Sequence, residues 1–350
     1  MTESKPVVKR ETKNKIRVEF EDRTPWLQRM KAKIFNMYFL KNVVWGIVRY
    51  VLLIGISYVV LYSFIIKILN SFKSKEDIQD VTVGMLSQYP TLNQYRYLIT
   101  ENKYFEALLN TFLISLIAAI LQTLICSLVA YGFAKFKFRG NGILFIFVMI
   151  TLMIPHSTLQ WSLQLHFTYD NFFGKLLQLF GAQETPSLIN TFWPMVLMCL
   201  TGLFYKNGLY IFMLRQFFKG VPDELEESAY VDGSGVFRTF FSIIIPLSIP
   251  MLVTVFVFAF AWQWTDVFYS DLFFTVNFRS GEDAIKFVED FASSVPEQLR
   301  DGGRWDGFES TYQPMVFGTA GLMIIAPLVL VYVFLQRYLV QGIERTGLVG

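Results

Sequence analysis

The sequence predicts an all-α polytopic membrane protein with about six transmembrane helices. The chain of 350 residues is 53% hydrophobic and 17% charged, whereas soluble domains are usually about 45–50% apolar and about 25% charged. Its aromatic share is 17%, with phenylalanine leading, which suits lipid-facing surfaces and interfacial belts. Long apolar runs also recur along the chain, and a helix of about 20 such residues crosses a bilayer core of about 30 Å.

Six stretches have the length and composition of a spanning helix. They are Val43–Leu69, Ala107–Phe133, Gly142–Trp161, Phe192–Met213, Ile243–Trp264 and Met315–Leu335. They predict one membrane domain, residues 43–340, between a basic N-terminal segment, residues 1–42, and a short C-terminal tail, residues 341–350.

The charges of the loops predict the orientation. Lysine and arginine crowd residues 1–49, follow the second and sixth predicted spans and flank the fourth and fifth, whereas the long loop 266–314 is acidic. Basic loops stay in the cytoplasm, so we expect both termini inside and loop 266–314 outside. A nucleic-acid-binding arm is the alternative for the basic segment, but no DNA- or RNA-binding module follows it.

The residues that usually carry chemistry do not predict an enzyme or a metal site. Cys126 and Cys199 lie in apolar runs and cannot form a disulfide framework, and His156 and His166 lack the spacing of zinc ligands. The sequence has no G-x-x-x-x-G-K-[ST] phosphate loop and no readable set of nucleophile, base and orienting residue. We therefore expect no metal and no cofactor bound by this chain.

The segment between the fourth and fifth predicted spans is the most informative. Gly220 breaks the preceding helix, Pro222 suits a first helical position, and Asp232-Gly233 is a turn and stop signal. These signals predict a short cytoplasmic helix of about two to three turns, near residues 221–233.

The two faces of this predicted helix differ. Leu225, Ser228 and Ala229 share one side by their i, i+3, i+4 spacing, and the small residues let another surface approach closely. Carboxylates that could pair with arginine or lysine stand at Asp223, Glu226 and Glu227. A plain solvated face is the alternative interpretation.

Two prolines begin the next span. Pro246 and Pro250 each remove a helix hydrogen bond and crowd the preceding turn, so we expect a bend there. The short helix and these prolines together resemble the EAA loop of ABC importer permeases, E-A-A-x-x-x-G followed at a fixed distance by I-x-L-P. The matching residues are Glu227, Ser228, Ala229, Gly233, Ile244 and Pro246, with Asp232 and Pro250 in commoner extensions.

The resemblance covers most of the chain. The further matches are Ala130–Phe136 to A-Y-x-F-A-R-F, Ile154-Pro155 to M-x-P, Phe212–Phe218 to F-L-L-R-Q-F-F, and Gln336–Tyr338 with the final glycines to the ending of carbohydrate permeases similar to the smaller maltose-transporter subunit. Departures also occur, because Ser228 and Ser234 replace alanines, Thr265 stands where asparagine is frequent, and loop 266–314 is longer than usual.

The resemblance implies the fold of an ABC type I importer permease in the bacterial plasma (inner) membrane. It implies a second homologous permease, a cytoplasmic ATPase dimer that binds ATP and Mg²⁺, an extracytoplasmic binding protein and an oligosaccharide as cargo, and no nucleic acid. The residues it assigns to ATPase coupling are Glu226, Glu227, Ser228, Ala229, Asp232, Gly233 and Pro246. In this scheme Glu227 pairs with a basic ATPase residue, Ala229 permits close packing, and Gly233 allows the exit turn.

Two other classes of transporter are weighed against this one. A permease of the same machinery could carry another solute, such as a polyamine or a phosphonate. An ion-coupled secondary transporter usually has inverted repeats and acidic residues within its spans, and this sequence has neither.

Residues of the substrate path are harder to identify. Tyr205, Trp262 and Trp264 could line it, although such aromatics are usually packing residues or interfacial anchors. Lys206 lies inside the fourth predicted span beside two glycines, and a lysine facing lipid there costs at least about 2.5 kcal/mol. We expect it to face the path or an acid on the partner permease.

Overall fold

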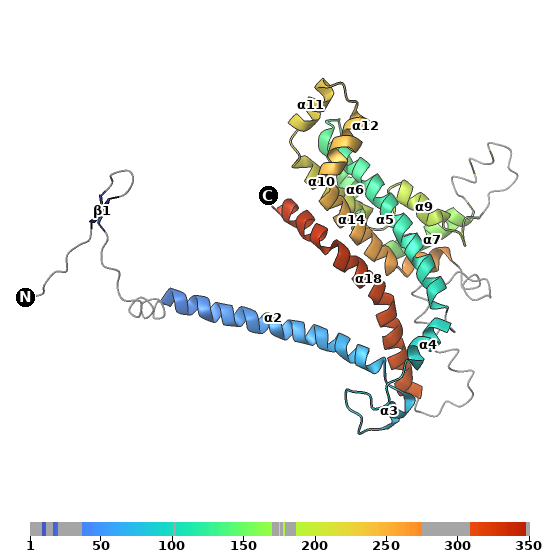
Figure 1. Cartoon of the computed structure of the whole chain (residues 1–350). Coiled ribbons are helices and arrows are strands. Elements are labelled where there is room, and N and C mark those ends of the chain that lie inside the picture. The colour runs from blue at the N-terminus through green and yellow to red at the C-terminus, as the bar shows by residue number, and fades with distance from the viewer. Residues whose placement is uncertain are drawn as a thin grey trace, which may run out of the picture. The chain divides into compact units, whose positions relative to one another are not determined.

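The protein is described by a computed structural model. It covers residues 9–11, 17–19, 37–100, 103–169, 175, 178, 187–274 and 309–347. Apart from one antiparallel strand pair, β1 (Lys9–Glu11) and β2 (Arg17–Glu19), the described elements are helices (Figure 1). The all-α class predicted from composition is confirmed, and the strand pair was not predicted.

The helices follow one another along the chain. They are α2 (Met37–Asn70), α3 (Lys75–Gln79), α4 (Asn93–Thr100), α5 (Tyr104–Lys135), α6 (Asn141–Thr151), α7 (His156–Thr168), α9 (Trp193–Leu200), α10 (Asn207–Lys219), α11 (Glu224–Val231), α12 (Val236–Thr239), the π-helix η1 (Phe240–Ile244), α13 (Ile245–Leu247), α14 (Ile249–Trp264), α15 (Phe268–Phe273) and α18 (Glu309–Gly347). Of the described helices, α2, α5 and α18 are long and apolar enough to cross a membrane, and two bent pairs raise the number of candidate spans to five.

The chain divides into two units, residues 1–66 and residues 67–350. The first holds the strand pair and most of α2. No residue of the most apolar window of α2 is buried. A helix that is apolar all round and uncovered requires lipid or other membrane helices as its surroundings.

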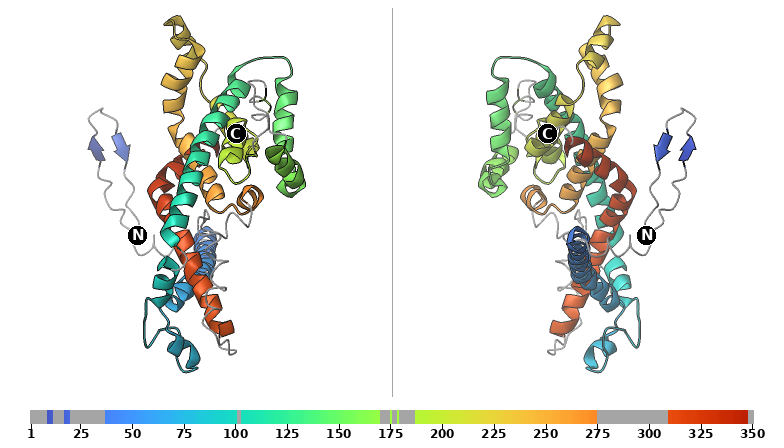
Figure 2. Two further views of the ribbon diagram at one scale, coloured as in Figure 1. Left: turned by 90° about the vertical axis from the view of Figure 1, so that its right-hand side faces the viewer. Right: turned by 90° about the vertical axis from the view of Figure 1, so that its left-hand side faces the viewer.

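Helix α5 is the centre of the second unit. It packs against α10 and α14, and α14 packs in turn against α18. The α5 side of this core uses small residues such as Ala119, Cys126 and Ala130, which are fully buried against larger ones such as Leu214 and Phe260. Small residues let membrane helices approach closely. In both views of Figure 2 the green α6–α7 segment lies at the periphery of this unit.

Two predicted spans are not continuous helices. The prediction for Gly142–Trp161 is wrong in this respect, because α6 and α7 meet at an angle of 96°, where Pro155 precedes the first residue of α7. The prediction for Phe192–Met213 is also wrong, since α9 ends at Leu200 and α10 begins only at Asn207.

The fifth predicted span, Ile243–Trp264, is bent as expected. The segment Val236–Leu247 and helix α14 form an angle of 81°, with Pro246 on one side of the bend and Pro250 on the other. The preceding turn is the π-helix η1, a form that frequently marks functional sites. The expected bend is therefore confirmed, and the part that continues as one straight helix is shorter than predicted.

The C-terminal elements extend beyond their predicted bounds. Helix α18 has 39 residues and includes all of Met315–Leu335. The predicted tail, residues 341–350, is helical as far as Gly347. The predicted loop 266–314 begins with the short helix α15 and ends inside α18, while residues 275–308 lie outside the described residues. Most of the predicted basic segment, residues 1–42, also lies outside them.

The segment after α2 is ordered around one carboxylate. Asp77 is buried and accepts hydrogen bonds from the backbone N–H groups of Ser74, Gln88 and Tyr89 and from the hydroxyl of Ser87. Burial alone would raise the pKa of Asp77, but these hydrogen bonds outweigh it and hold the pKa below its usual value. The ionised carboxylate therefore fixes this loop.

Candidate functional site

Helix α11 is the short helix predicted between the fourth and fifth spans. It has eight residues and lies with α12 at the opposite end of the second unit from α3 and α4 (Figure 1). Pro222 precedes the helix instead of opening it, because Asp223 is the N-cap residue. Gly233 has a φ of 79° and its N–H bonds the carbonyl of Tyr230, which confirms the predicted stop.

The inner face of α11 is fixed to the C-terminal end of α5. The ammonium of Lys135 lies 3.1 Å from Oε1 of Glu226 and donates a hydrogen bond of 2.6 Å to Oδ1 of Asp223. The hydroxyl of Tyr131 donates to Oε2 of Glu226 at 2.8 Å. The side chains of Lys135 and Glu226 are 7% and 8% exposed. We call these four residues the α5–α11 clamp.

The clamp has clear energetic consequences. A buried ion pair adds little net stability compared with apolar packing, but removing one partner leaves a buried charge without compensation and costs about 3–5 kcal/mol. Lys135 also donates to the backbone carbonyl of Val221, so it fixes the turn that enters α11 as well. The hydrogen bond from Lys135 lowers the pKa of Asp223, and the carboxylate stays charged.

Two residues assigned to ATPase coupling are not on the exposed surface of α11. Glu226 and Ala229 are both buried within this chain, Glu226 is paired with Lys135, and the part of both residues in ATPase coupling stays a prediction. The clamp residues Tyr131 and Lys135 were not predicted. Their signal was present in the Ala130–Phe136 motif, because the i, i+4 spacing sets both side chains on one face of α5.

The outer face of α11 carries the remaining coupling candidates. Glu227, Ser228 and Asp232 are exposed, and Val231 beside them is 88% exposed. This face combines exposed carboxylates with an exposed apolar side chain, and the described part of the chain does not cover them. Pro246 is not on this face, because it lies in α13 beside the 81° bend.

A second feature is a cavity of about 570 Å³, lined by residues of the α6–α7 segment, of α9, α10 and the break between them, and by Tyr269. Most of its lining is apolar, and its polar residues include His156, His166, Lys206 and Asn207. The volume lies within the range of about 300–1,000 Å³ usual for ligand pockets.

Lys206 stands in the break between the two helices. It is the N-cap residue of α10 with a φ of 62°, and Gly202, at the other end of the break, has a φ of 74°. The 13 residues of α10 separate it from Gly220, which is about 20 Å at 1.5 Å per residue. The predicted position of Lys206 inside the membrane would require protein or water around its charge.

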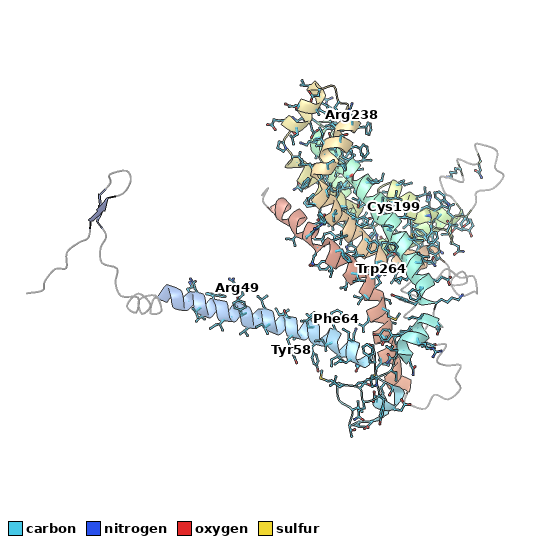
Figure 3. All side chains as sticks on the ribbon, viewed as in Figure 1. Arg49, Tyr58, Phe64, Cys199, Arg238 and Trp264 are labelled. Atoms are coloured by element: carbon cyan, nitrogen blue, oxygen red, sulfur yellow. The ribbon has the colours of Figure 1, made fainter. Side chains whose placement is uncertain are left out.

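Aromatic rings meet this requirement in part. The ammonium of Lys206 lies 4.7 Å from the ring centroid of Tyr205 and 5.0 Å from that of Trp262, within the range of cation–π attraction. Three of the four predicted path residues are thus brought together. The fourth, Trp264, is buried and its Nε1–H donates to the carbonyl of Ile324 in α18, so it is a packing residue (Figure 3).

Buried polar groups without partners surround the same break. The side chain of Asn207 is almost fully buried, and neither of its amide atoms has a hydrogen-bond partner in the described part of the chain. The hydroxyl of Tyr210, one turn further along α10, is in the same condition there. Such groups in a native protein indicate a role for water or a ligand.

These features together define a class of protein. The protein is a helical membrane protein with a short two-faced helix at one end and a cavity at broken helices. This architecture is that of the membrane component of a transporter. Residues 122–345, more than half of the chain, match the family described as "Binding-protein-dependent transport system inner membrane component". The chain belongs to this family.

Curated relatives agree with this assignment. The arabinooligosaccharides transport system permease protein AraQ of Halalkalibacterium halodurans is 25% identical over 310 residues, which cover 87% of this chain and 98% of the relative. The maltodextrin transport system permease protein MalD of Streptococcus pneumoniae is 26% identical over 300 residues, covering 85% and 93%.

A solved structure has the same fold. The crystal structure of a bacterial ABC transporter involved in the import of the acidic polysaccharide alginate contains a chain that matches with a TM-score of 0.63 and 19% identity, over 85% of this chain and 97% of that one. The predicted ABC importer permease fold is confirmed.

The functional class predicted from the motifs is confirmed as well. The chain is a multi-pass inner-membrane permease subunit and not itself an enzyme. Its system includes an ATPase and a binding protein. Permeases of this family bind no cofactor, and ATP belongs to the ATPase.

Proposed function

We propose that this chain forms half of the transmembrane pathway for an oligosaccharide, beside a second, homologous permease. The curated relatives named above are described as permeases for arabinooligosaccharides and maltodextrin, which supports a carbohydrate cargo. A cytoplasmic ATPase dimer, with ATP and Mg²⁺, drives the cycle, and an extracytoplasmic binding protein delivers the sugar. Both termini are cytoplasmic and loop 266–314 is outside, as the loop charges indicate.

The two faces of α11 are the observation that carries the coupling mechanism. The outer face offers Glu227 to a basic residue of the ATPase, and the small Ser228 lets the two surfaces approach. The inner face is held by the clamp through Lys135 and Glu226. When the ATPase dimer closes around ATP, the docked helix moves and the clamp passes this motion to α5, the centre of the second unit.

The cargo passes the break between α9 and α10. Tyr205 and Trp262 present aromatic faces, whose ring centroids are 5.5 Å apart, and Lys206 adds a cation. Lys206 also speaks against a polyamine as cargo, because like charges repel at this depth. A phosphonate remains the non-sugar rival, and its uptake by the purified transporter would replace the carbohydrate proposal.

Charge reversal at Glu227 tests the coupling. In Glu227→Lys we expect the complex to reach the membrane, while substrate uptake and stimulation of the ATPase by the binding protein are lost, because two like charges meet where a pair formed. The matched control is Glu106→Lys, an equally radical change at an exposed glutamate in the first turn of α5. Normal coupling in Glu227→Lys would remove α11 as the docking helix.

A further inference from the structure

We propose that the cavity at the α9–α10 break binds a carboxylate of the cargo, so that the imported oligosaccharide contains uronic acid. This inference rests on the proposed carbohydrate function and goes beyond it, because it identifies the chemical class of the sugar. It is carried by three features of the cavity: the sign of its permanent charge, a buried amide without partners, and the aromatic rings on its wall.

Lys206 is the one permanently charged residue among the described residues that line the cavity, and these include no aspartate or glutamate. The imidazoles of His156 and His166 also line the cavity. Nδ1 of His156 lies 3.1 Å from the hydroxyl of Tyr269, within hydrogen-bond distance. Lys206 forms no ion pair with any described residue. An anion is the ligand that compensates an ammonium deep in a bilayer.

Asn207 adds a second, independent indication. It lines the cavity next to Lys206 and keeps both amide atoms without a partner among the described side chains and backbone. An amide offers two N–H donors and a carbonyl acceptor, which match the carboxylate and the hydroxyl groups of a sugar acid. Leaving such a group buried and unpaired is unfavourable, because the amide loses its hydrogen bonds to water without replacement, so a bound partner is favoured.

Aromatic rings on the cavity wall fit the sugar that bears the acid. Phe167, Phe204 and Tyr269 line the cavity, whereas Tyr205 and Trp262 do not line it and lie beside the ammonium of Lys206. The apolar face of a pyranose can pack on the lining rings while its carboxylate reaches Lys206. No arginine lines this cavity within the described chain, so the bidentate guanidinium contacts that are frequent at phosphate sites are not offered by its described lining.

The test uses the complete transporter, with both permeases, ATPase and binding protein, in proteoliposomes. The probes are oligogalacturonate, oligomannuronate and a neutral maltotriose. We expect uptake of a uronate probe, and in Lys206→Met a rise of about tenfold in its KM, the scale of a lost charged hydrogen bond. Lys206→Arg keeps the cation and should restore the KM to within about threefold. Increasing salt should raise the KM of the wild type more than that of Lys206→Met.

The matched control is Lys219→Met, which removes an exposed lysine at the other end of α10 and should leave the KM unchanged. An unchanged uronate KM in Lys206→Met overturns the proposal. Loss of copurifying partner permease in both Lys206→Met and Lys206→Gln also overturns it, because Lys206 would then form an ion pair between subunits. Uptake of maltotriose alone overturns it while the carbohydrate function stands, and uptake of no carbohydrate overturns both.

Discussion

Replacing Lys135 by methionine should release α11 from α5. Methionine keeps the apolar stem and removes the ammonium, so Glu226, 8% exposed, keeps a charge that only Tyr131 partly satisfies. Breaking a buried pair costs about 3–5 kcal/mol. The bond to Asp223, whose side chain is 76% exposed, adds at most about 1 kcal/mol. Because Glu226 keeps its hydrogen bond from Tyr131, we expect the lower end of this range. The free energy that holds α11 against α5 should fall by about 3 kcal/mol.

Hydrogen exchange of the α11 amides measures this quantity directly. At 1.36 kcal/mol per factor of ten, a loss of about 3 kcal/mol accelerates exchange at residues 227–232 by about two orders of magnitude if local opening limits it. Amides in the middle of α5 should not change. In the reconstituted transporter the same variant should hydrolyse ATP with little uptake, because the docked helix no longer moves α5.

Two variants control for the mechanism. Asp223→Asn removes only the exposed partner and should accelerate exchange by less than about fivefold. The double variant Lys135→Met/Glu226→Gln leaves no buried charge and should recover part of the loss, which a double-mutant cycle quantifies. If α11 in Lys135→Met exchanges within about threefold of the wild type, the clamp does not hold this helix and the reasoning fails.

Three other outcomes are expected. Gly233→Leu should uncouple transport. A side chain at this position would meet no neighbour, so the cost is not a clash but a backbone strain of about 1–2 kcal/mol at positive φ. Gly233→Asn should be milder, and equal activity of the two variants would contradict this. With the two native cysteines replaced, an impermeant thiol reagent on intact cells should label Val81→Cys and spare Glu227→Cys; the reverse pattern would invert the topology. The protection of the Gln88 amide from hydrogen exchange, relative to its intrinsic exchange rate at the same pH, should fall as the pH drops below about 4. The lowered pKa of Asp77 means that its carboxylate stabilises the loop only while it is ionised, so Asp77→Asn should abolish this pH dependence.

The length of the apolar runs predicted which segments could span a membrane, but it did not predict where the helices in them break. Phe192–Met213 is apolar enough to span, yet it is interrupted between Leu200 and Asn207. Gly202 and Lys206 both have positive φ, and nothing in composition distinguishes a loosened helix from a broken one. The bend at Pro246 and Pro250 has a local cause in the two prolines and was predictable.

The coupling helix was predictable as an element, but the roles of its neighbouring acids were not. Glu226 and Glu227 are adjacent and chemically identical, and only the position of α5 decides that the first is buried and the second exposed. Lys135 and Tyr131, which bind the buried Glu226, are far from it in the sequence. The motif that contains them was visible in the sequence, and its contact with α11 was not.

Gly208 has a consequence for how the two irregular segments move. A Cβ atom there would lie 2.7 Å from Oγ1 of Thr151 and 2.9 Å from the carbonyl oxygen of Val148, so α10 and α6 touch backbone to backbone just below the break. Helices in such contact cannot slide past each other without a clash. A push along α10 from its C-terminal end, at Lys219, should therefore carry the end of α6 with it. The two sides of the cavity would then shift together as one gate instead of opening independently.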